Sequence, residues 1–505
     1  MTSVLIFEHT SDQNYASAQY SCSPIFGGWH PKIATYENIV YVAWDYFHGC
    51  GQRTLLLAHS DDNGETFGSP LTLANESSAG SEPTIMASGS NVYVAWTDYM
   101  THPGKLLFKM SKDYGNSFGS AIELSSNDTQ ENKAVGMIAS GDAVGVVWSG
   151  YVIGGNGSRV FLSEVAGNSG SVTTSVLSQG AGNSFASQVV QADGKAYVLW
   201  VSYGNCNPGN KQCPATSYVT TIDLASNSIA HAVRLEEYAG RIAVSGSTVY
   251  AAGIVSHEYN TWKTENGAKI YLQTVGNRTI VFAKSIDDGK TFGSPQVLGT
   301  FDDSTDSIDN LALDADQNNV YLTWVDASKP WSSSILMIAS TDGGNSFGKT
   351  MAIVGPGAYL NGPEPLALQQ QVSTSGKSYY AIWQNNPQTL FFRKSPDAGS
   401  MLDNATDLQD IMHISNPGCF LASDGNNVYI AGTGNEGHTT FTRSADGGNT
   451  FDNAIDLDKN SASTVPEFPF VIPVLLISIT SLIVFYKIKF VIRPLDCSRL
   501  ENIVR

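Results

Sequence analysis

The sequence Val40-Tyr41-Val42-Ala43-Trp44 occurs again, unchanged, at positions 92–96. Variants end at Trp148 and Trp200, so the first four copies follow one another at steps of 52 residues. Later variants, at less regular spacing, end at Gly253, Trp324, Trp383 and Gly432. Short runs of apolar β-branched and aromatic residues are typical of buried strands. The eight copies therefore predict a chain built from eight repeats of one sheet-forming unit.

A second pattern, S-x-D-x-G-x-[ST]-F, recurs intact five times, and eroded copies start at Ser163 and Ser395. Its aspartate can accept hydrogen bonds from the backbone N–H groups of its own turn, and its glycine supplies a positive φ. We therefore predict tight hairpins, each with a closing phenylalanine between neighbouring sheets. Their structural residues are Asp62, Gly64, Phe67, Asp113, Gly115, Phe118, Asp287, Gly289, Phe292, Asp342, Gly344, Phe347, Asp446, Gly448 and Phe451.

This eight-residue pattern resembles the Asp-box, or bacterial neuraminidase repeat, of the sialidase superfamily, and the resemblance covers residues 31–458. In that family the box joins the third and fourth strands of each propeller blade. The resemblance implies an all-β fold, a β-propeller of four-stranded antiparallel blades. We favour eight blades, with seven as the alternative. Residues 1–30 form an N-terminal segment in which 3–7 is a candidate for a strand that closes the last blade.

The C-terminal part differs in kind from the repeats. Residues 468–486 carry no charge and would span roughly 28 Å as a helix, enough for a bilayer core of about 30 Å, so we expect one transmembrane helix. The basic tail 487–505 is then cytoplasmic and the propeller extracellular. Residues 459–467 form a linker. No secretory signal is visible at the first residues, which favours a start of the natural chain further upstream.

The linker contains Pro466-Glu467, and Phe468 follows it. Together with the apolar span and the basic cluster, this Pro-Glu-Phe motif resembles the archaeal C-terminal sorting signals that archaeosortases read. The resemblance implies an archaeal cell-surface protein and an archaeosortase-like processing enzyme as a partner.

The net charge and the spacing of the cysteines argue against two other kinds of protein, nucleic-acid binders and zinc proteins. With 28 Lys+Arg against 46 Asp+Glu the formal net charge is −18, so we expect no nucleic-acid partner. No cysteine or histidine cluster has zinc spacing, and we expect no metal or cofactor. The alternative is calcium held by the acidic loop Asp302, Asp303, Asp306 and Asp309. Cys206 and Cys213 bracket a turn-rich loop and are the candidate disulfide.

In sialidases the propeller face opposite the box hairpins holds the catalytic site. On that face, the loops from second to third strands supply the candidates Asp45, Tyr46, His48, Asp98, Tyr99, His102, Tyr151, Tyr203, His257, Tyr259, Trp262, Asp326 and Trp331. The loops between blades add Glu82, Glu131, Glu236, Glu237, Asp309, Tyr359, Glu364 and His413. Aromatic rings stack on sugars and carboxylates accept sugar hydroxyls, so this face predicts an extracellular glycan or protein ligand.

Sialidase chemistry needs three arginines on the substrate carboxylate, a Tyr–Glu nucleophile and an acid/base aspartate. The family's Arg-Ile-Pro motif is matched here only by residues 241–243, which lack the proline. Arg393 and Arg443 fall beside the hairpins, on the wrong face. A two-carboxylate glycosidase would use Glu364 with Asp98 or Asp309. The candidates for catalysis are Arg241, Arg53, Arg159, Tyr359, Glu364 and Asp98, which do not assemble into a convincing site.

We therefore expect a membrane-anchored, cell-surface propeller that serves as a binding or cell-envelope module for glycans or surface proteins. The alternative is an exo-sialidase-like glycoside hydrolase on the extracellular side, and the third possibility is an architectural surface component. Three arginines meeting in one pocket beside a Tyr–Glu contact would favour the enzyme.

Overall fold

The computed structural model describes residues 27–459 with gaps. The gaps are 49–52, 76–80, 99–103, 141–142, 156, 168, 181, 205–214, 224–225, 227, 236–239, 266–267, 303–307, 330–331, 356–369, 387–388 and 416–417. The chain divides into two units, 1–459 and 460–505. Among the described residues, no helix has the length and apolar character needed to cross a membrane. The predicted transmembrane span 468–486, its linker from residue 460 onward and its tail lie outside this part.

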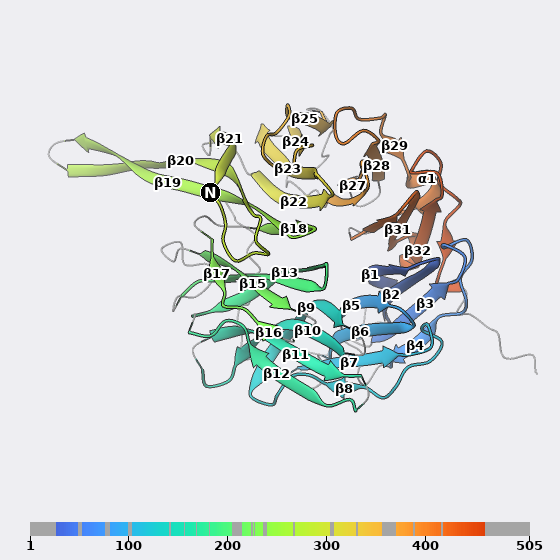
Figure 1. The fold of residues 1–505 in the computed structure, drawn as a ribbon. Helices are drawn as coiled ribbons and strands as arrows, with labels where there is room; N and C mark the ends of the chain where they lie inside the picture. The colour runs from blue at the N-terminus through green and yellow to red at the C-terminus, as the bar shows by residue number, and fades with distance from the viewer. Residues whose placement is uncertain are drawn as a thin grey trace, which may run out of the picture. The chain divides into compact units, whose positions relative to one another are not determined.

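Unit 1 consists of eight antiparallel sheets in chain order (Figure 1), which we call blades 1 to 8. Blade 1 contains β1 (Gly27–Tyr36), β2 (Ile39–Phe47), β3 (Arg53–Ser60) and β4 (Leu71–Ala74). Blade 2 contains β5 (Ser81–Ser88), β6 (Asn91–Asp98), β7 (Lys105–Ser111) and β8 (Ile122–Glu123). Blade 3 contains β9 (Thr129–Ser140), β10 (Ala143–Val152), β11 (Gly157–Ala166) and β12 (Val172–Val176). Blade 4 contains β13 (Ser184–Ala192), β14 (Lys195–Ser202), β15 (Thr216–Asp223) and a split outer strand, β16 (Ser228–Ile229) and β17 (Val233–Arg234).

The second half repeats the same plan. Blade 5 contains β18 (Arg241–Ser245), β19 (Thr248–Glu265), β20 (Ala268–Ser285) and β21 (Gln296–Asp302). Blade 6 contains β22 (Ile308–Asp316), β23 (Asn319–Lys329), β24 (Ser332–Ser340) and β25 (Met351–Val354). Blade 7 contains β26 (Gln370–Ser375), β27 (Ser378–Asn386), β28 (Thr389–Ser395) and β29 (Thr406–Asp407), followed by the short helix α1 (Gln409–Met412). Blade 8 contains β30 (Phe420–Asp424), β31 (Asn427–Thr433), a 3-10 turn (Asn435–Gly437), β32 (Thr439–Ser444) and β33 (Ile455–Asp456).

The eight repeats of the Val-Tyr-Val-Ala-Trp pattern are the second strands of the eight blades. Each first strand contacts the first strand of the next blade, and β30 and β31 of blade 8 contact β1. The sheets therefore close into an eight-bladed propeller, and the seven-bladed alternative is wrong. The first strands, starting with β1, line the central channel.

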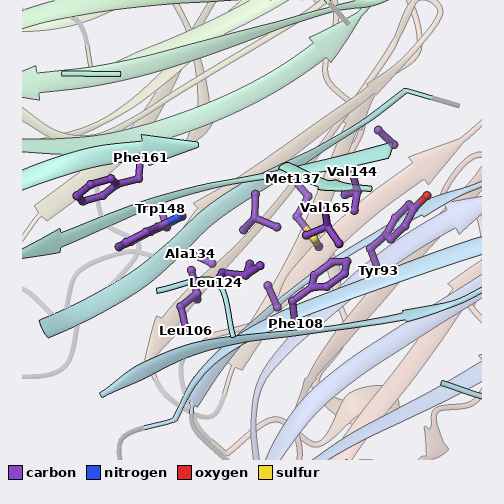
Figure 2. Close-up of a cluster of buried hydrophobic side chains, with 13 residues drawn as sticks. Tyr93, Leu106, Phe108, Leu124, Ala134, Met137, Val144, Trp148, Phe161 and Val165 are labelled. Atoms are coloured by element: carbon purple, nitrogen blue, oxygen red, sulfur yellow. The ribbon is translucent and has the colours of Figure 1, made fainter. Parts of the chain in front are cut away.

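The core lies between the blades. In the cluster of Figure 2, Tyr93 and Phe108 of blade 2 pack against Met137, Trp148 and Phe161 of blade 3. The ring centroids of Trp148 and Phe161 are 4.2 Å apart. Burial of such rings between sheets removes apolar surface from water, so no blade is stable without its neighbours.

Residues from the two ends of unit 1 form the contact that closes the ring. Trp44 of β2 donates its indole N–H to Asp458 Oδ1 (2.8 Å), and the backbone N–H of Thr439 donates to Asp458 Oδ2 (2.6 Å). Thr433 Oγ1 donates to the Gly28 carbonyl (2.8 Å). The fourth strand of blade 8, β33, comes from the C-terminal end of the unit, and the first described residues form the innermost strand β1. The candidate closing strand 3–7 lies outside the described residues.

Each S-x-D-x-G copy forms a hairpin between the third and fourth strands. In the first copy, Ser60 Oγ donates to Asp62 Oδ1 (2.6 Å) and accepts from the Gly64 N–H (2.8 Å). Thr66 donates its N–H (2.9 Å) and its hydroxyl (2.6 Å) to the same carboxylate. The pattern recurs in the copies that begin at Ser111, Ser285, Ser340 and Ser444. We call these elements the aspartate hairpins.

The donors around each aspartate stabilise its charged form. Hydrogen bonds from Ser117 and Ser111 lower the pKa of Asp113 to about 2, and those from Ser285 and Thr291 do the same for Asp287. In the first hairpin burial opposes the shift, but the hydrogen bonds from Ser60 and Thr66 still lower the pKa of Asp62 to about 2. The aspartates therefore stay charged at any ordinary pH and act as structural acceptors.

The two eroded copies differ in outcome. At Ser395 the hairpin persists, because the Gly399 N–H donates to Ser395 Oγ (2.9 Å) and the Met401 N–H donates to Asp397 Oδ1 (2.8 Å). The expected copy at Ser163 is wrong. Ser163 lies inside β11, where its hydroxyl accepts the indole N–H of Trp148 (2.9 Å), because blade 3 has no aspartate in register to cap a turn there.

The hairpins also join successive blades. Phe67, Phe347 and Phe451 each pack edge-on against a phenylalanine of the preceding blade, with ring centroids 4.8 to 4.9 Å apart. The prediction that these rings lie between sheets is therefore confirmed for the three hairpins. Arg443 of blade 8 donates to the carbonyls of Asp62 and Asn63 in blade 1, both at 3.2 Å. It performs a structural task on the hairpin face.

We predict that two buried carboxyls make the propeller less stable as the pH rises. Burial raises the pKa of Asp458 and Asp314 from 3.8 to about 6, against opposing hydrogen bonds from Thr439 and Thr374 respectively. The folded state holds each proton more tightly than the unfolded state does. The contribution is therefore complete below pH 3.8 and is lost as the pH rises through about 6.

Each carboxyl should account for about 3 kcal/mol, because its pKa shift is about two units. Denaturant unfolding measures the effect. The Asp458→Asn variant cannot titrate at this position. Between about pH 4 and about pH 7, its free energy of unfolding should therefore fall by about 3 kcal/mol less than that of the wild type. An equal loss in both proteins would contradict the assignment.

Blade 5 carries an arm that the sequence did not predict. The β19–β20 ladder runs from Val249↔Ser285 to Glu265↔Ala268, whereas β18 pairs only as far as Ala252 and β21 only as far as Asn277. Beyond these points the arm has two strands (Figure 1). The expectation that His257, Tyr259 and Trp262 lie in a loop is wrong, because they belong to β19. Asn266-Gly267, a strong hairpin signal, was the missed indication.

Candidate functional site

The two ends of the propeller carry different connections. On one face the aspartate hairpins lie beside the turns between first and second strands, since the Asn63 N–H donates to the Asn38 carbonyl (2.8 Å). Equivalent bonds recur in blades 2, 5, 6, 7 and 8, from Tyr114, Asp288, Gly343, Ala398 and Gly447. The loops from second to third strands and from blade to blade therefore share the opposite face, which we call the loop face.

The described candidates for a ligand face are at the loop-face ends of their strands. Asp45 and Asp98 are buried there, at 0% and 2% exposure, and are not free groups on a surface. Tyr151, Tyr203 and Asp326 are partly buried. The candidates Tyr99, His102, Glu236, Glu237, Trp331, Tyr359 and Glu364 lie outside the described residues, and the side chains of His257, Tyr259, Trp262 and Asp309 are not described. His413 ends α1 with a left-handed backbone (φ 48°).

The first strands of blades 1, 2 and 3 begin with the same irregularity. Their pairing slips between Trp29 and Lys32, between Ser81 and Thr84, and between Gln130 and Lys133. The bulged residues His30, Glu82 and Glu131 have φ of 52°, 61° and 54°. This left-handed conformation is costly for residues other than glycine, and such strain concentrates at functional sites. Three adjacent blades therefore each present a polar side chain at the equivalent position. These positions lie at the loop-face end of the central channel, which we call the channel mouth.

A buried carboxylate anchors the first bulge. Asp45 Oδ1 lies 2.9 Å from His30 Nδ1, and Asp45 Oδ2 accepts a hydrogen bond from the guanidinium of Arg53. The His30 side chain is 38% exposed and that of Arg53 is 30% exposed, although Asp45 itself is buried. The carboxylate therefore orients two basic groups that remain accessible to a ligand.

Residues of the next two blades continue the cluster of charges. Lys133 Nζ lies 2.5 Å from Glu82 Oε2, and both side chains are more than one-third exposed. Lys32, at the position equivalent to Lys133, lies with its ammonium 5.0 Å from the ring centroid of Phe420 in blade 8. Burial and the positive charge of Lys133 lower the pKa of Lys32, although the carboxylate of Glu82 opposes the shift. Charges from three blades and an aromatic ring from a fourth therefore converge at the channel mouth.

Aromatic rings border this cluster. The Trp29 ring centroid lies 6.2 Å from the ring centroid of His30, and the Tyr46 ring lies 5.0 Å from that of His48. His48 Nε2 is 2.7 Å from Thr54 Oγ1, which holds the imidazole in place. Trp29, Tyr46 and Phe420 are partly exposed. Such rings can stack on a ligand while the charged groups fix its orientation.

The arginines proposed for a sialidase-type triad have different local partners. Arg53 pairs with Asp45 inside blade 1, Arg159 donates to the Gly182 carbonyl (2.7 Å), and Arg241 donates to the Gly240 carbonyl (2.8 Å). Arg393 donates to the Ile353 carbonyl (2.5 Å) of the neighbouring blade. Each of these guanidinium groups therefore binds backbone or carboxylate groups next to it in the structure.

The predictions of a calcium site and of a disulfide involve residues other than those of the channel mouth. In the described ranges, no group of three or more His, Cys, Asp or Glu residues could hold a metal ion. Of the acidic loop, Asp303 and Asp306 lie outside those ranges. Cys206 and Cys213 also lie outside them, so their disulfide stays a prediction. Cys419 is a free, buried cysteine.

Comparison with known proteins identifies structural relatives only. No protein-family model matches the chain, and no curated protein sequence matches it. Among solved structures, an ulvan lyase of family PL25 bound to -[GlcA(1-4)Rha3S]- is 10% identical, with 87% of this chain and 98% of that chain covered and a TM-score of 0.45. The subtype N10 neuraminidase-like protein of A/little yellow-shouldered bat/Guatemala is 9% identical, with 63% and 96% covered and a TM-score of 0.32.

A GH32 β-fructofuranosidase of Bombyx mori is 13% identical, with 77% of this chain and 89% of that chain covered and a TM-score of 0.30. At these identities the likeness concerns the arrangement of the chain and does not extend to activity or ligand.

The sequence named Asp45, Arg53 and Glu82 but missed His30, Lys32 and Lys133. These three lie in the first strands β1 and β9, whereas the sequence candidates were taken from loops. A weak signal was present: Pro31 and Pro83 stand at equivalent places in blades 1 and 2, each directly after a bulged polar residue. Proline in a strand is confined to edges and bulges.

Proposed function

We propose that the protein is a membrane-anchored, cell-surface propeller of the Asp-box type that binds glycans or surface proteins through its loop face. The observation that carries the proposal is the set of left-handed bulges at His30, Glu82 and Glu131. Backbone strain repeated at one channel mouth is retained where a ligand uses the side chains that it presents. The five intact aspartate hairpins and the sixth at Ser395 support the Asp-box assignment.

A binding role accounts for the polar groups better than sialidase chemistry does. An arginine triad needs guanidinium groups that point together at one carboxylate. Arg159 and Arg241 instead donate to the carbonyls of Gly182 and Gly240. Partly exposed rings and oriented charges are what a lectin-like surface requires.

The membrane anchor is proposed from the apolar span 468–486, and the archaeal type of cell surface from the Pro-Glu-Phe motif at 466–468. The propeller is then extracellular, the tail 487–505 is cytoplasmic, and an archaeosortase-like enzyme is the candidate processing partner. Expression in an archaeal host tests this. The full chain should resist carbonate extraction from membranes, and its propeller should be cleaved by protease added outside intact cells. Release by carbonate would contradict the anchor.

A glycan array tests the binding role directly, with the full-length chain in detergent. We expect binding to at least one glycan class, and no hydrolysis of fluorogenic sialosides. Turnover of a sialoside that Arg241→Ala abolishes would overturn the proposal in favour of the enzyme. An array without any bound glycan would overturn the glycan part of it.

A further inference from the structure

The bulges of blades 1 to 3 place cations beside the carboxylate of Glu82. Lys32 and Lys133 occupy equivalent positions, each directly after a bulge, and Glu82 lies at the bulge between them. Lys133 forms an ion pair with Glu82 (2.5 Å). The charges of Lys133, His30 and Lys32 lower the pKa of Glu82, although burial raises it. The carboxylate of Glu82 thus shows which chemistry this arrangement stabilises, namely an oxyanion between ammonium groups.

The cluster balances its cations and carboxylates. The cations of Lys32, Arg53 and Lys133 lie with the imidazole of His30 beside the carboxylates of Asp45, Glu82 and Glu131. The chain as a whole carries −18, so a mouth in which cations match carboxylates is a local exception. No described residue forms an ion pair with Lys32, whose ammonium instead lies over the Phe420 ring. Glu82 is in direct contact with Lys133 and acts on Lys32 only through space, so the partly desolvated Lys32 ammonium gains from an anion in direct contact.

We infer that the channel mouth formed by His30, Lys32, Glu82 and Lys133 binds the carboxylate or sulfate group of an acidic saccharide. The inference rests on the proposed glycan-binding function and names the ligand class. Lys32 and Lys133 pair with the oxyanion, and the ligand displaces Glu82 from Lys133. His30, held by Asp45, donates a further hydrogen bond.

The rings beside the cluster favour a sugar over an acidic peptide. Trp29 directly precedes the bulge and lies beside His30, so an anionic group held by the cluster leaves its sugar ring within reach of the indole face. Tyr46 adds a second ring on the neighbouring strand, where Asp45 pairs with Trp29 in the ladder. An aromatic face next to a cation is the arrangement that uronic acids and sulfated sugars require.

Isothermal titration calorimetry on the full-length chain in detergent tests the inference with matched probes. Trigalacturonic acid and its methyl ester share one backbone and differ in charge, and a sulfated galactan trisaccharide distinguishes sulfate from carboxylate. We expect at least one acidic probe to bind about tenfold or more tightly than the ester, with an affinity that falls as salt is added. Equal affinity for acid and ester would overturn the inference.

Three variants separate the site from the overall charge of the protein. Lys32→Gln should weaken binding of the acidic probe about tenfold and leave the ester unchanged. Glu82→Gln should strengthen binding of the acidic probe about three- to tenfold, because the substitution releases Lys133 from its ion pair. A misfolded protein cannot produce such a gain. Lys349→Gln removes the same charge at an exposed position on the hairpin face and should change nothing. Unchanged affinity in Lys32→Gln and Glu82→Gln would overturn the inference.

The outcomes also separate this inference from the proposed function. Neutral glycans bound on the array, with no preference for acidic probes, would overturn the inference and leave the binding role standing. No bound glycan of any kind would overturn both.

Discussion

Replacement of Gly448 by alanine is expected to lower the free energy of unfolding by about 2–5 kcal/mol. Gly448 has φ +78°, and a Cβ placed there would lie 2.4 Å from Phe392 Cζ, which belongs to β28 of the preceding blade. The left-handed backbone costs about 1–2 kcal/mol for an L-residue, and forcing a methyl group into a packed seam costs about 1–3 kcal/mol more. Phe392 is buried and packs against Phe451, so it has little room to move.

Gly425 in the same blade is a matched control. It has φ +58°, and no atom lies within 4 Å of its hypothetical Cβ. Gly425→Ala should therefore cost only the backbone term of about 1–2 kcal/mol. Guanidinium unfolding followed by circular dichroism compares the two variants. Equal losses would mean that the contact with the preceding blade adds nothing, and the role of the aspartate hairpins in joining blades would have to be abandoned.

The second large effect is expected at the contact that closes the ring. Trp44 is completely buried between blades 1 and 8, and its indole N–H donates to Asp458. Trp44→Ala should lower the free energy of unfolding by about 3–5 kcal/mol through the lost apolar contact and the cavity left behind. Trp44→Phe retains a ring and should cost about 1–3 kcal/mol, since it leaves Asp458 without one of its donors.

Trp383 provides the matched position in blade 7. It ends the same strand pattern and is buried, but its Nε1 has no hydrogen-bond partner among the described residues. Trp383→Phe removes an unsatisfied polar group and should therefore cost less than Trp44→Phe by about 1–2 kcal/mol. Thermal melting of both variants measures the difference. A larger loss in Trp383→Phe would argue against the Trp44–Asp458 bond as a main contribution to closure.

The aspartate hairpins were predictable because their interactions are local. Ser60, Asp62, Gly64 and Thr66 bond to one another within seven residues, so the order of residue types alone specifies the turn. The failure at Ser163 follows from the same rule: without the aspartate, serine and glycine do not specify a hairpin, and the residue stays in β11.

The candidate site was predictable only in part, because a bulge is not visible in a strand pattern. Asp45 and Arg53 follow the repeat at positions where loops were expected, and the sequence named both. His30 and Lys32 lie just before a strand pattern and gave no sign that they face Glu82 and Lys133. Those residues lie in the next two repeats, about 50 and 100 positions further along the chain.

The sequence alone indicated eight sheet-forming units, with seven blades as the alternative, and the aspartate hairpins that six of them carry, because the chemistry of a strand or a turn acts over a few residues. Tertiary structure decided the closure of the ring, in which Trp44 meets Asp458 across 414 positions, and the cluster of charges at the channel mouth. Both depend on the angle at which one sheet packs on the next. That angle results from the summed packing of all eight blades, which no single repeat encodes.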